Sequence, residues 1–138
     1  MSDTNKNIPQ KAYSPDDVIF ETVAPGSDKA RLVLFSAGTE DPNPVHLDDD
    51  FAKEAGYPTV LQQGPMTTAH FSRLLAEKVG QDNLISLDVR FTGPVFLDED
   101  LTMTAIVTGV EDSVVTCALT AAKPDGSLTA KATAEFRI

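Results

Sequence analysis

The sequence is poor in the residues that build several common kinds of site. Its 138 residues include a single cysteine, Cys117, which excludes an internal disulfide and supplies no cysteine cluster for a metal. No apolar run approaches the roughly 20 residues of a membrane-spanning helix. The first 15 residues, MSDTNKNIPQKAYSP, lack the apolar segment of a secretory signal. We therefore expect residues 1–15 to be a flexible leader and the protein to be cytoplasmic.

Basic residues are also scarce. Lys and Arg number 11 against 21 Asp and Glu, which gives a formal net charge of −10 at pH 7. Nucleic acids and anionic membrane surfaces bind through clusters of Lys and Arg, so the charge argues against both partners. A small anionic ligand would need a local basic patch. The acidity suits a purely solubilising surface equally well, and composition leaves these alternatives open.

The first half of the chain predicts one strand and several helices. No repeat or linker divides the sequence, so residues 16–138 are expected to form one domain. Turn, capping and stop residues set the expected boundaries. The expected elements are a strand over residues 18–23, a helix capped by Ser27 and reaching Gly38, a short helix FAKEA capped by Asp48 or Asp49, and a long helix over 65–79 opened by Gly64 and stopped by Gly80.

From residue 84 the apolar period changes to two, which indicates strands. ISLDVRF, DLTMTAIVTGV, SVVTCALTAAK and SLTAKATAEFRI are the four segments. In the last segment the expected apolar face comprises Leu128, Ala130, Ala132, Ala134 and Phe136. Residues 124–126, Pro-Asp-Gly, predict a hairpin turn. Helices followed by an antiparallel run predict an α+β fold, with small inward side chains that let the long helix pack closely on the sheet.

The stretch TEDPNPVHLDDD, residues 39–50, concentrates groups that acid–base chemistry uses. Asp41 and His46 lie within six residues, and Pro42 and Pro44 restrict the backbone between them. A carboxylate beside an imidazole can share the two proton transfers of an addition or elimination reaction. Asn-Pro and Asp-Pro pairs also form ordinary turns, and Asp runs also cap helices. These residues alone leave both interpretations open.

This stretch resembles the signature D-x-N-P-[aliphatic]-H of the MaoC-like (R)-specific enoyl-CoA hydratases and 3-hydroxyacyl dehydratases. The matching residues are Asp41, Asn43, Pro44, Val45 and His46. The segment LDVRFTGPVFLDEDLTM is similar to a second family motif, through Arg90, Phe91, Pro94 and Val95. The resemblance covers about residues 30–138.

The resemblance implies a hotdog fold, in which an antiparallel sheet wraps around the helix of residues 65–79. It implies that Asp41 and His46 activate a water that adds to a trans-2-enoyl thioester, giving an (R)-3-hydroxyacyl thioester. Asn43 would support the loop, and the backbone N–H of Gly64 would polarise the thioester oxygen. It implies neither cofactor nor metal. It also implies a homodimer, or a heterodimer with a homologous chain.

The chain departs from the family pattern at two places. Gln63 stands where members usually carry His, and it can support the loop by hydrogen bonds without titrating. The turn of residues 97–100 reads Leu-Asp-Glu-Asp instead of the frequent Pro-Gly-Asp. The first departure motivates an alternative, in which this chain is a non-catalytic partner subunit of a heteromeric dehydratase. A hotdog thioesterase is ranked last, because the long helix has only Glu77 as an acid, about three turns from Gly64.

Other polar residues carry less weight. His70 is expected to be a packed or interface histidine, Met66 to fill the core or line an acyl tunnel, and Cys117 to be a small buried apolar group. CoA is preferred to an acyl carrier protein, because those carriers are acidic and would be repelled by a chain of charge −10. The cations available to bind the CoA phosphates are Arg73, Lys78, Arg90, Lys123, Lys131 and Arg137.

Overall fold

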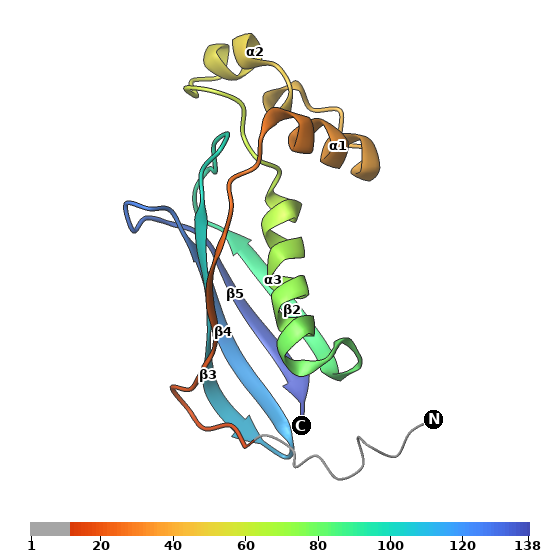
Figure 1. Ribbon diagram of the computed structural model, residues 1–138, viewed down its shortest axis with the longest axis vertical. Coiled ribbons are helices and arrows are strands. Elements are labelled where there is room, and N and C mark those ends of the chain that lie inside the picture. Colours follow the sequence, from red (N-terminus) through yellow and green to blue (C-terminus); the bar gives the residue numbers. More distant parts are fainter. Residues whose placement is uncertain (1–11) are drawn as a thin grey trace.

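A computed structural model describes residues 12–138 and has an antiparallel sheet curved around one long helix (Figure 1). The elements are β1 (Val18–Ala24), α1 (Lys29–Thr39), η2 (Pro44–His46), α2 (Asp49–Glu54), α3 (Gly64–Val79), η3 (Gln81–Asn83), β2 (Leu84–Phe91), β3 (Leu101–Glu111), β4 (Val114–Ala122) and β5 (Leu128–Arg137). The strand order is β1-β3-β4-β5-β2, and every neighbouring pair is antiparallel. The predicted α+β class is confirmed.

The sheet buries one face, as the two-residue period predicts. Leu101, Met103, Ala105 and Val107 of β3 are all buried, and most of the residues between them are exposed. The β3–β4 hairpin turns at Asp112 and Ser113, whose φ angles of 51° and 64° match the two left-handed residues of a two-residue hairpin turn with the twist of the sheet. The predicted turn at residues 124–126 joins β4 to β5.

One prediction for β5, that the side chain of Leu128 faces the core, is wrong. Leu128 is 36% exposed, whereas Thr129 is 2% exposed. The cause is a shift in the β4–β5 register, because Ala121 pairs with Ala130 while Ala122 pairs with Leu128. Such a bulge turns the side chains before it to the other face of the strand.

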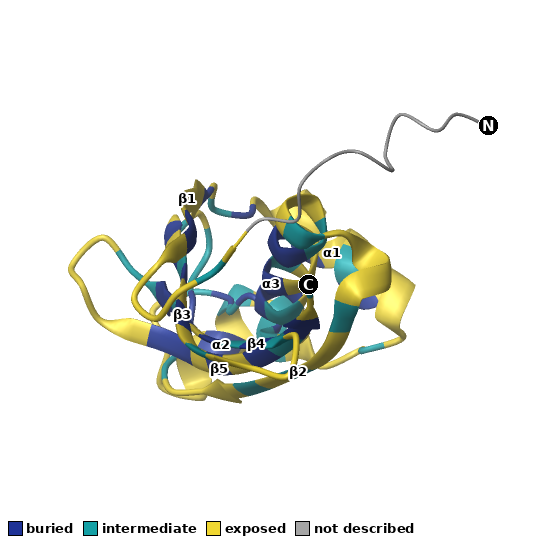
Figure 2. Cartoon of the chain, turned by 90° about the horizontal axis from the view of Figure 1, so that it is seen from below, coloured by how far each residue is buried: buried dark blue, intermediate teal, exposed yellow. Residues whose placement is uncertain are grey.

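The main core lies between α3 and the sheet (Figure 2). Phe71, Leu74 and Leu75 form the buried stripe of α3 at helical spacing. Small side chains face them from the sheet: Ala105, Ala121, Ala130, Ala132 and Ala134 are all buried. This confirms that small inward residues line the sheet beneath the helix. Gly80 ends α3 with a φ of 88°, which favours glycine.

Residues 25–63 form a second, smaller unit, the helical cap, which contains α1, η2 and α2 and lies where α3 begins (Figure 1). Its apolar cluster consists of Leu32, Ala52, Val60 and Met66, the last contributed by α3. The predicted capping role of Ser27 is wrong. Asp28 accepts the N–H of Arg31 as the N-cap of α1, whereas the Ser27 hydroxyl is buried and donates to Met66 Sδ at 3.2 Å.

The expected leader, residues 1–15, falls only partly within the described residues. Residues 1–11 of the expected leader lie outside the described residues. Tyr13 packs edge-on against Phe136, with ring centroids 5.2 Å apart. No helix among residues 12–138 is long and apolar enough to cross a membrane.

Candidate active site

The loop after α1 brings Asp41 and His46 together. α1 ends at Thr39 and is followed by its C-cap, Glu40, whose φ of 55° and ψ of 38° reverse the chain. The next residue, Asp41, donates its backbone N–H to Ser36 O at 2.9 Å. Asn43 lies inside the loop, where its Oδ1 accepts the N–H of Val45 at 3.1 Å and its own N–H donates to Asp41 Oδ1 at 3.2 Å. The loop therefore leaves α1 with a fixed geometry.

The two candidate catalytic groups face each other. His46 Nε2 lies 3.5 Å from Asp41 Oδ2, and the side chains are 14% and 40% exposed. His46 Nδ1 lies 2.8 Å from the carbonyl oxygen of Leu61. Because a carbonyl oxygen only accepts, Nδ1 carries a proton and donates it in that bond. In the neutral ring Nε2 is then an acceptor, so Nε2 is the atom that can take up and return a proton beside Asp41.

Gly64 is the first residue of α3. Among the described residues, no hydrogen bond uses its backbone N–H, as is usual for the first turn of a helix. A side chain here would meet Phe91, because a Cβ atom on Gly64 would lie 3.1 Å from that ring. The open N–H and the positive end of α3 can stabilise a developing oxyanion.

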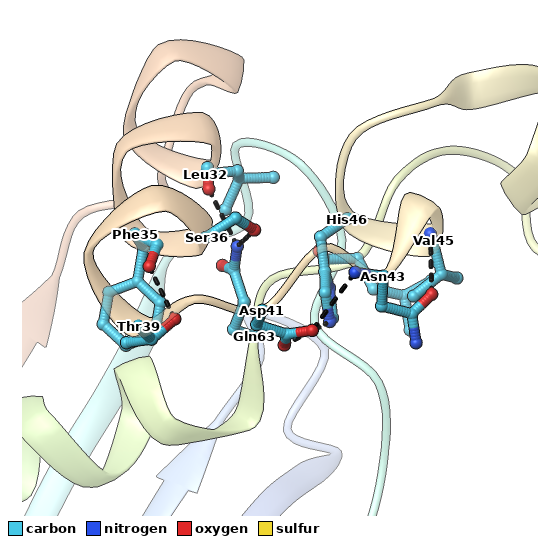
Figure 3. Close-up of polar contacts among 10 residues, drawn as sticks. Leu32, Phe35, Ser36, Thr39, Asp41, Asn43, Val45, His46 and Gln63 are labelled. Atoms are coloured by element: carbon cyan, nitrogen blue, oxygen red, sulfur yellow. Dashed lines mark hydrogen bonds and ion pairs between the residues drawn. The ribbon is translucent and has the colours of Figure 1, made fainter.

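Gln63 sits immediately before Gly64 and reaches α1 (Figure 3). Its Nε2 donates to Leu32 O and to Ser36 Oγ, both at 2.8 Å, and the residue is only 1% exposed. Its Oε1 is buried and has no partner among residues 12–138. The side chain thus contacts the helix that precedes the loop, not the loop itself.

The unusual turn at residues 97–100 packs against the entry to α1. Asp98 donates its N–H to Ser27 O at 2.9 Å, and Asp100 Oδ1 accepts the N–H of Gly26 at 2.7 Å. A side chain at Gly26 would collide with the backbone of Asp98. Glu99 accepts from Phe96 N. This turn therefore holds the start of the helical cap without the Pro-Gly-Asp sequence.

Two hollows border the helical cap. A hollow of about 460 Å³ lies beside Asp41, and its lining also includes Val33, Ala37, Pro42 and Leu47, so an apolar group fits next to the carboxylate. A larger groove of about 890 Å³ runs between α1 and α3. The residues lining this α1–α3 groove include Arg31, Phe35, Met66, His70, Arg73 and Asp98.

The α1–α3 groove is lined by charges of both signs, with Arg31 and Arg73 facing it beside Asp28 and Asp98. Arg31 and Arg73 line it together with His70, which is half-buried. Burial, followed by the charges of Arg73 and Arg31, lowers the pKa of His70 below its usual value. Arg31 was absent from the cations selected by sequence. The residue pattern of α1 does not single out Arg31 as a candidate ligand contact, because Arg31 comes near Arg73 only when α1 packs beside α3.

Met66, Cys117 and Glu77, the other residues considered from the sequence, lie in the core or in surface ion pairs. Met66 is 4% exposed and belongs to the cap cluster. Cys117 is fully buried with Val115 and Leu119, and burial raises the pKa of its thiol to about 11. Glu77 is exposed and pairs with Arg73 at 3.1 Å. Within residues 12–138, no three His, Cys, Asp or Glu side chains group closely enough to hold a metal ion.

The chain is similar in sequence and in structure to known hydratases. The (R)-specific enoyl-CoA hydratase of Aeromonas caviae is 30% identical over 93 residues, covering 66% of this chain and 69% of that protein. The solved (R)-hydratase from A. caviae involved in PHA biosynthesis has a TM-score of 0.83 at 21% identity, covering 93% of this chain and 98% of that one. The ChsH1–ChsH2 complex from Mycobacterium tuberculosis gives a TM-score of 0.82 at 23% identity, covering 92% and 99%.

These likenesses confirm the hotdog fold predicted from the sequence. The family match spans residues 5–124 and bears the description MaoC like domain. It includes all five residues of the D-x-N-P-[aliphatic]-H signature. The chain therefore belongs to the MaoC-like domain family.

Proposed function

We propose that this protein catalyses the reversible hydration of trans-2-enoyl thioesters to (R)-3-hydroxyacyl thioesters. The observation that carries the proposal is the approach of His46 Nε2 to Asp41 Oδ2 at 3.5 Å, with His46 Nδ1 engaged by a carbonyl. Family membership and the relationship to (R)-specific enoyl-CoA hydratases support hydro-lyase chemistry. The proposed catalytic residues are Asp41 and His46, and Asn43 supports their loop.

A water between the two acceptors can donate one hydrogen bond to Asp41 and one to Nε2 of neutral His46. In hydration, its oxygen forms a bond to C3 while one of the two groups removes its proton. The π electrons move toward the thioester oxygen, and as the thioester C=O re-forms, the group that took the water proton returns it to C2. Because Asp41 and His46 are adjacent, both would meet the same face of a bound enoyl group, and we expect the hydroxyl and the proton to add to that face. Dehydration reverses each step.

Gly64 completes the proposed site. The negative charge that develops on the thioester oxygen needs a donor already in place, and a backbone N–H at the start of α3 provides one. The helix dipole favours negative charge at the same point. The hollow beside Asp41, with its mostly apolar lining, is suited to hold carbon atoms next to the acid–base pair.

The direct test is hydration of crotonyl-CoA and longer trans-2-enoyl-CoAs, followed by loss of the conjugated chromophore. Asp41→Asn and His46→Gln should each lower kcat by about 100- to 10,000-fold, the usual contribution of general acid–base catalysis. Asp50→Asn, which removes an exposed carboxylate of α2, is the matched control and should retain activity. Full activity in both site variants would refute the assigned roles.

In the α1–α3 groove, Arg31 and Arg73 are the candidate partners of the CoA phosphates, beside the carboxylates of Asp28 and Asp98. An acidic carrier protein would have to approach a body of net charge −10. Arg31→Ala should raise KM for crotonyl-CoA about tenfold, the equivalent of one charge-assisted hydrogen bond to phosphate, with kcat unchanged. Lys53→Ala, which removes an exposed cation of α2 outside the groove, is the control. Faster turnover of carrier-protein thioesters would contradict the choice of CoA.

The exposed edge of β2 supports a homodimer. When a two-fold axis relates two antiparallel β2 strands, opposite residues share a face, so one residue must lie directly opposite its own copy and the axis passes between the two. Centring it on Val89 sets Asp88 opposite Arg90 of the second copy, twice. The same register sets Leu87 opposite Phe91, which is 51% exposed. Centring it on Asp88 or Arg90 would oppose like charges.

Neither Asp88 nor Arg90 forms an ion pair within residues 12–138, and Arg90 lies opposite Lys131 of β5. Asp88→Arg should weaken the dimer in sedimentation experiments, as should Arg90→Asp. The double variant Asp88→Arg/Arg90→Asp restores opposite charges in the same register and should recover the wild-type mass. If the double variant is weaker than either single variant, this register is wrong.

A second candidate role is that of a partner subunit in a heteromeric dehydratase. Gln63 in place of the usual His favours it, as does the structural likeness to a chain of the ChsH1–ChsH2 complex. A purified chain that hydrates no enoyl thioester alone, and gains activity when mixed with a homologous chain, would support this role. Activity of the purified homodimer would exclude it as the main function.

A further inference from the structure

Gln63 is a buried amide whose orientation is fixed by its neighbours. Leu32 O can only accept, so the side-chain atom 2.8 Å from it is the Nε2 amide group. The same nitrogen donates its second proton to Ser36 Oγ at 2.8 Å. This leaves Oε1 buried without a donor among the described residues. A buried, unpaired oxygen lowers the stability of the fold, so stability alone does not account for a glutamine at this position.

Ser36 connects this amide to Asp41. Its hydroxyl receives the bond from Gln63, and its backbone oxygen receives the N–H of Asp41 at 2.9 Å. Ser36 is itself only 6% exposed. Since Glu40 turns the chain immediately before Asp41, the carboxylate moves with the last turn of α1. Gln63 therefore sets the separation between that turn and the start of α3.

His46 is attached to the same short segment. Its Nδ1 binds Leu61 O at 2.8 Å, and Leu61 N donates to Val45 O at 3.0 Å. Gly64 closes the segment. Residues 61–64 thus contact all three parts of the candidate site: Leu61 binds His46, Gln63 binds the helix that leads to Asp41, and Gly64 is the candidate oxyanion donor.

We propose that Gln63 is a positioning residue, which acts through Ser36 to hold Asp41 in register with His46 and Gly64. This inference rests on the proposed hydratase function. The two N–H bonds of one amide nitrogen explain why glutamine suits this position. A glutamate has no N–H to donate, and a neutral imidazole has one.

The experiment compares two adjacent buried glutamines. Gln63→Met keeps the length of the side chain and removes its link to α1. Gln62→Met is the matched control, because Gln62 is 8% exposed and its Nε2 donates to Thr67 of α3, not to α1. Gln63→Met should lower kcat about 100-fold with KM changed less than about twofold, as expected for a misplaced catalytic group. Gln62→Met should leave both parameters near wild type.

Ser36→Ala tests the route of the effect. It should lower kcat less than Gln63→Met, and the double variant Gln63→Met/Ser36→Ala should be no slower than Gln63→Met, because both remove one link. Gln63→His, which keeps one N–H donor, should recover part of kcat. Equal losses in Gln62→Met and Gln63→Met, or additive losses in the double variant, would overturn the proposal.

Amide hydrogen exchange separates this proposal from the proposed function. If the wild type hydrates no enoyl thioester, the hydratase assignment fails, and exchange at Asp41 N–H still reports on the link. Gln63→Met should accelerate that exchange, whereas Gln62→Met should not. Unchanged exchange at Asp41 in Gln63→Met would overturn the positioning role whatever the activity.

Discussion

The sheet with α3 and the helical cap are held together in different ways. Between α3 and the sheet, 19 residues form one continuous buried cluster. The cap cluster has four buried members. α1 buries only Leu32 and Ser36, and it leaves Leu34 71% exposed. Polar contacts compensate in the cap, since Asp28 and Asp48 cap its helices and Gln63 ties α1 to α3.

The comparison shows that stability and the candidate chemistry are carried by different parts of the chain. Asp41 and His46 belong to the cap, whereas Gly64 begins the helix that anchors the main core. A region with few buried contacts opens locally at a lower free energy than the core does. We therefore expect changes in the sheet core to act on global unfolding, and changes in the cap to act first on activity.

The largest effect on stability should come from Leu75→Ala in α3. Leu75 is fully buried in the main cluster. Removing its side chain loses apolar burial and leaves a cavity that the surrounding side chains fill only in part, which costs about 2–5 kcal/mol. Urea unfolding followed by circular dichroism measures the loss. At temperatures where the variant is folded, kcat should stay close to wild type. A kcat loss larger than that of Leu32→Ala would contradict the division between the regions.

Leu32→Ala is the matched change in the cap, because Leu32 is also fully buried. Its smaller cluster can relax around the missing side chain, so we expect a loss at the lower end, about 2 kcal/mol. Leu32 O also accepts from Gln63, so kcat should fall more than in Leu75→Ala. Hydrogen exchange should accelerate in α1 and leave β4 protected. Equal acceleration in both regions would show that the cap and the sheet unfold as one unit.

The same division explains which features were predictable from sequence. Strand and helix positions follow from apolar periods and from Gly, Pro and Asp at their ends, so α3, β3 and β5 were predicted closely. Asp41 and His46 were predictable as neighbours because they lie in one short loop. Each of these features depends on a sequence pattern that lies within a segment of about 15 residues.

The features that sequence missed depend on packing between distant segments. Leu128 faces outward because of a register shift at Ala121 and Ala122, which no period reveals. Asp28 replaced Ser27 as the N-cap because Ser27 is buried against Met66. The link from Gln63 to Ser36 spans 27 positions. Only the folded arrangement of α1 on α3 creates it.

A smaller effect is expected from Asp48→Ala. The Asp48 carboxylate accepts the N–H groups of Asp50 and Phe51 at 2.9 and 3.3 Å and so caps α2. Losing an N-cap costs about 1 kcal/mol. We expect a modest fall in the midpoint of thermal unfolding. Asp48→Asn, which keeps the acceptor oxygen, should restore most of it, and failure to do so would show that the charge matters more than the hydrogen bond.

The smallest effect concerns the pH dependence of the cap. The Thr59 hydroxyl and the Val60 N–H donate to Asp49 Oδ1 at 2.8 and 3.2 Å. The Thr59 bond, followed by the Val60 bond, lowers the pKa of Asp49 below its ordinary value of 3.8. Since the folded pKa is the lower one, the stabilisation is complete above pH 3.8 and is lost as pH falls through the folded value.

Asp49→Asn removes this titration and keeps an acceptor oxygen. Wild type should therefore unfold at a higher temperature than the variant near pH 7, and the two should converge as pH falls below 3.8. Asp50→Asn removes a neighbouring carboxylate that accepts neither bond, and it is the control for net charge. A constant difference between wild type and Asp49→Asn across this range would show that the two bonds do not depend on the carboxylate charge. Convergence for Asp49→Asn alone would show that the polar contacts of the cap weaken at a pH where the buried contacts of the sheet do not titrate.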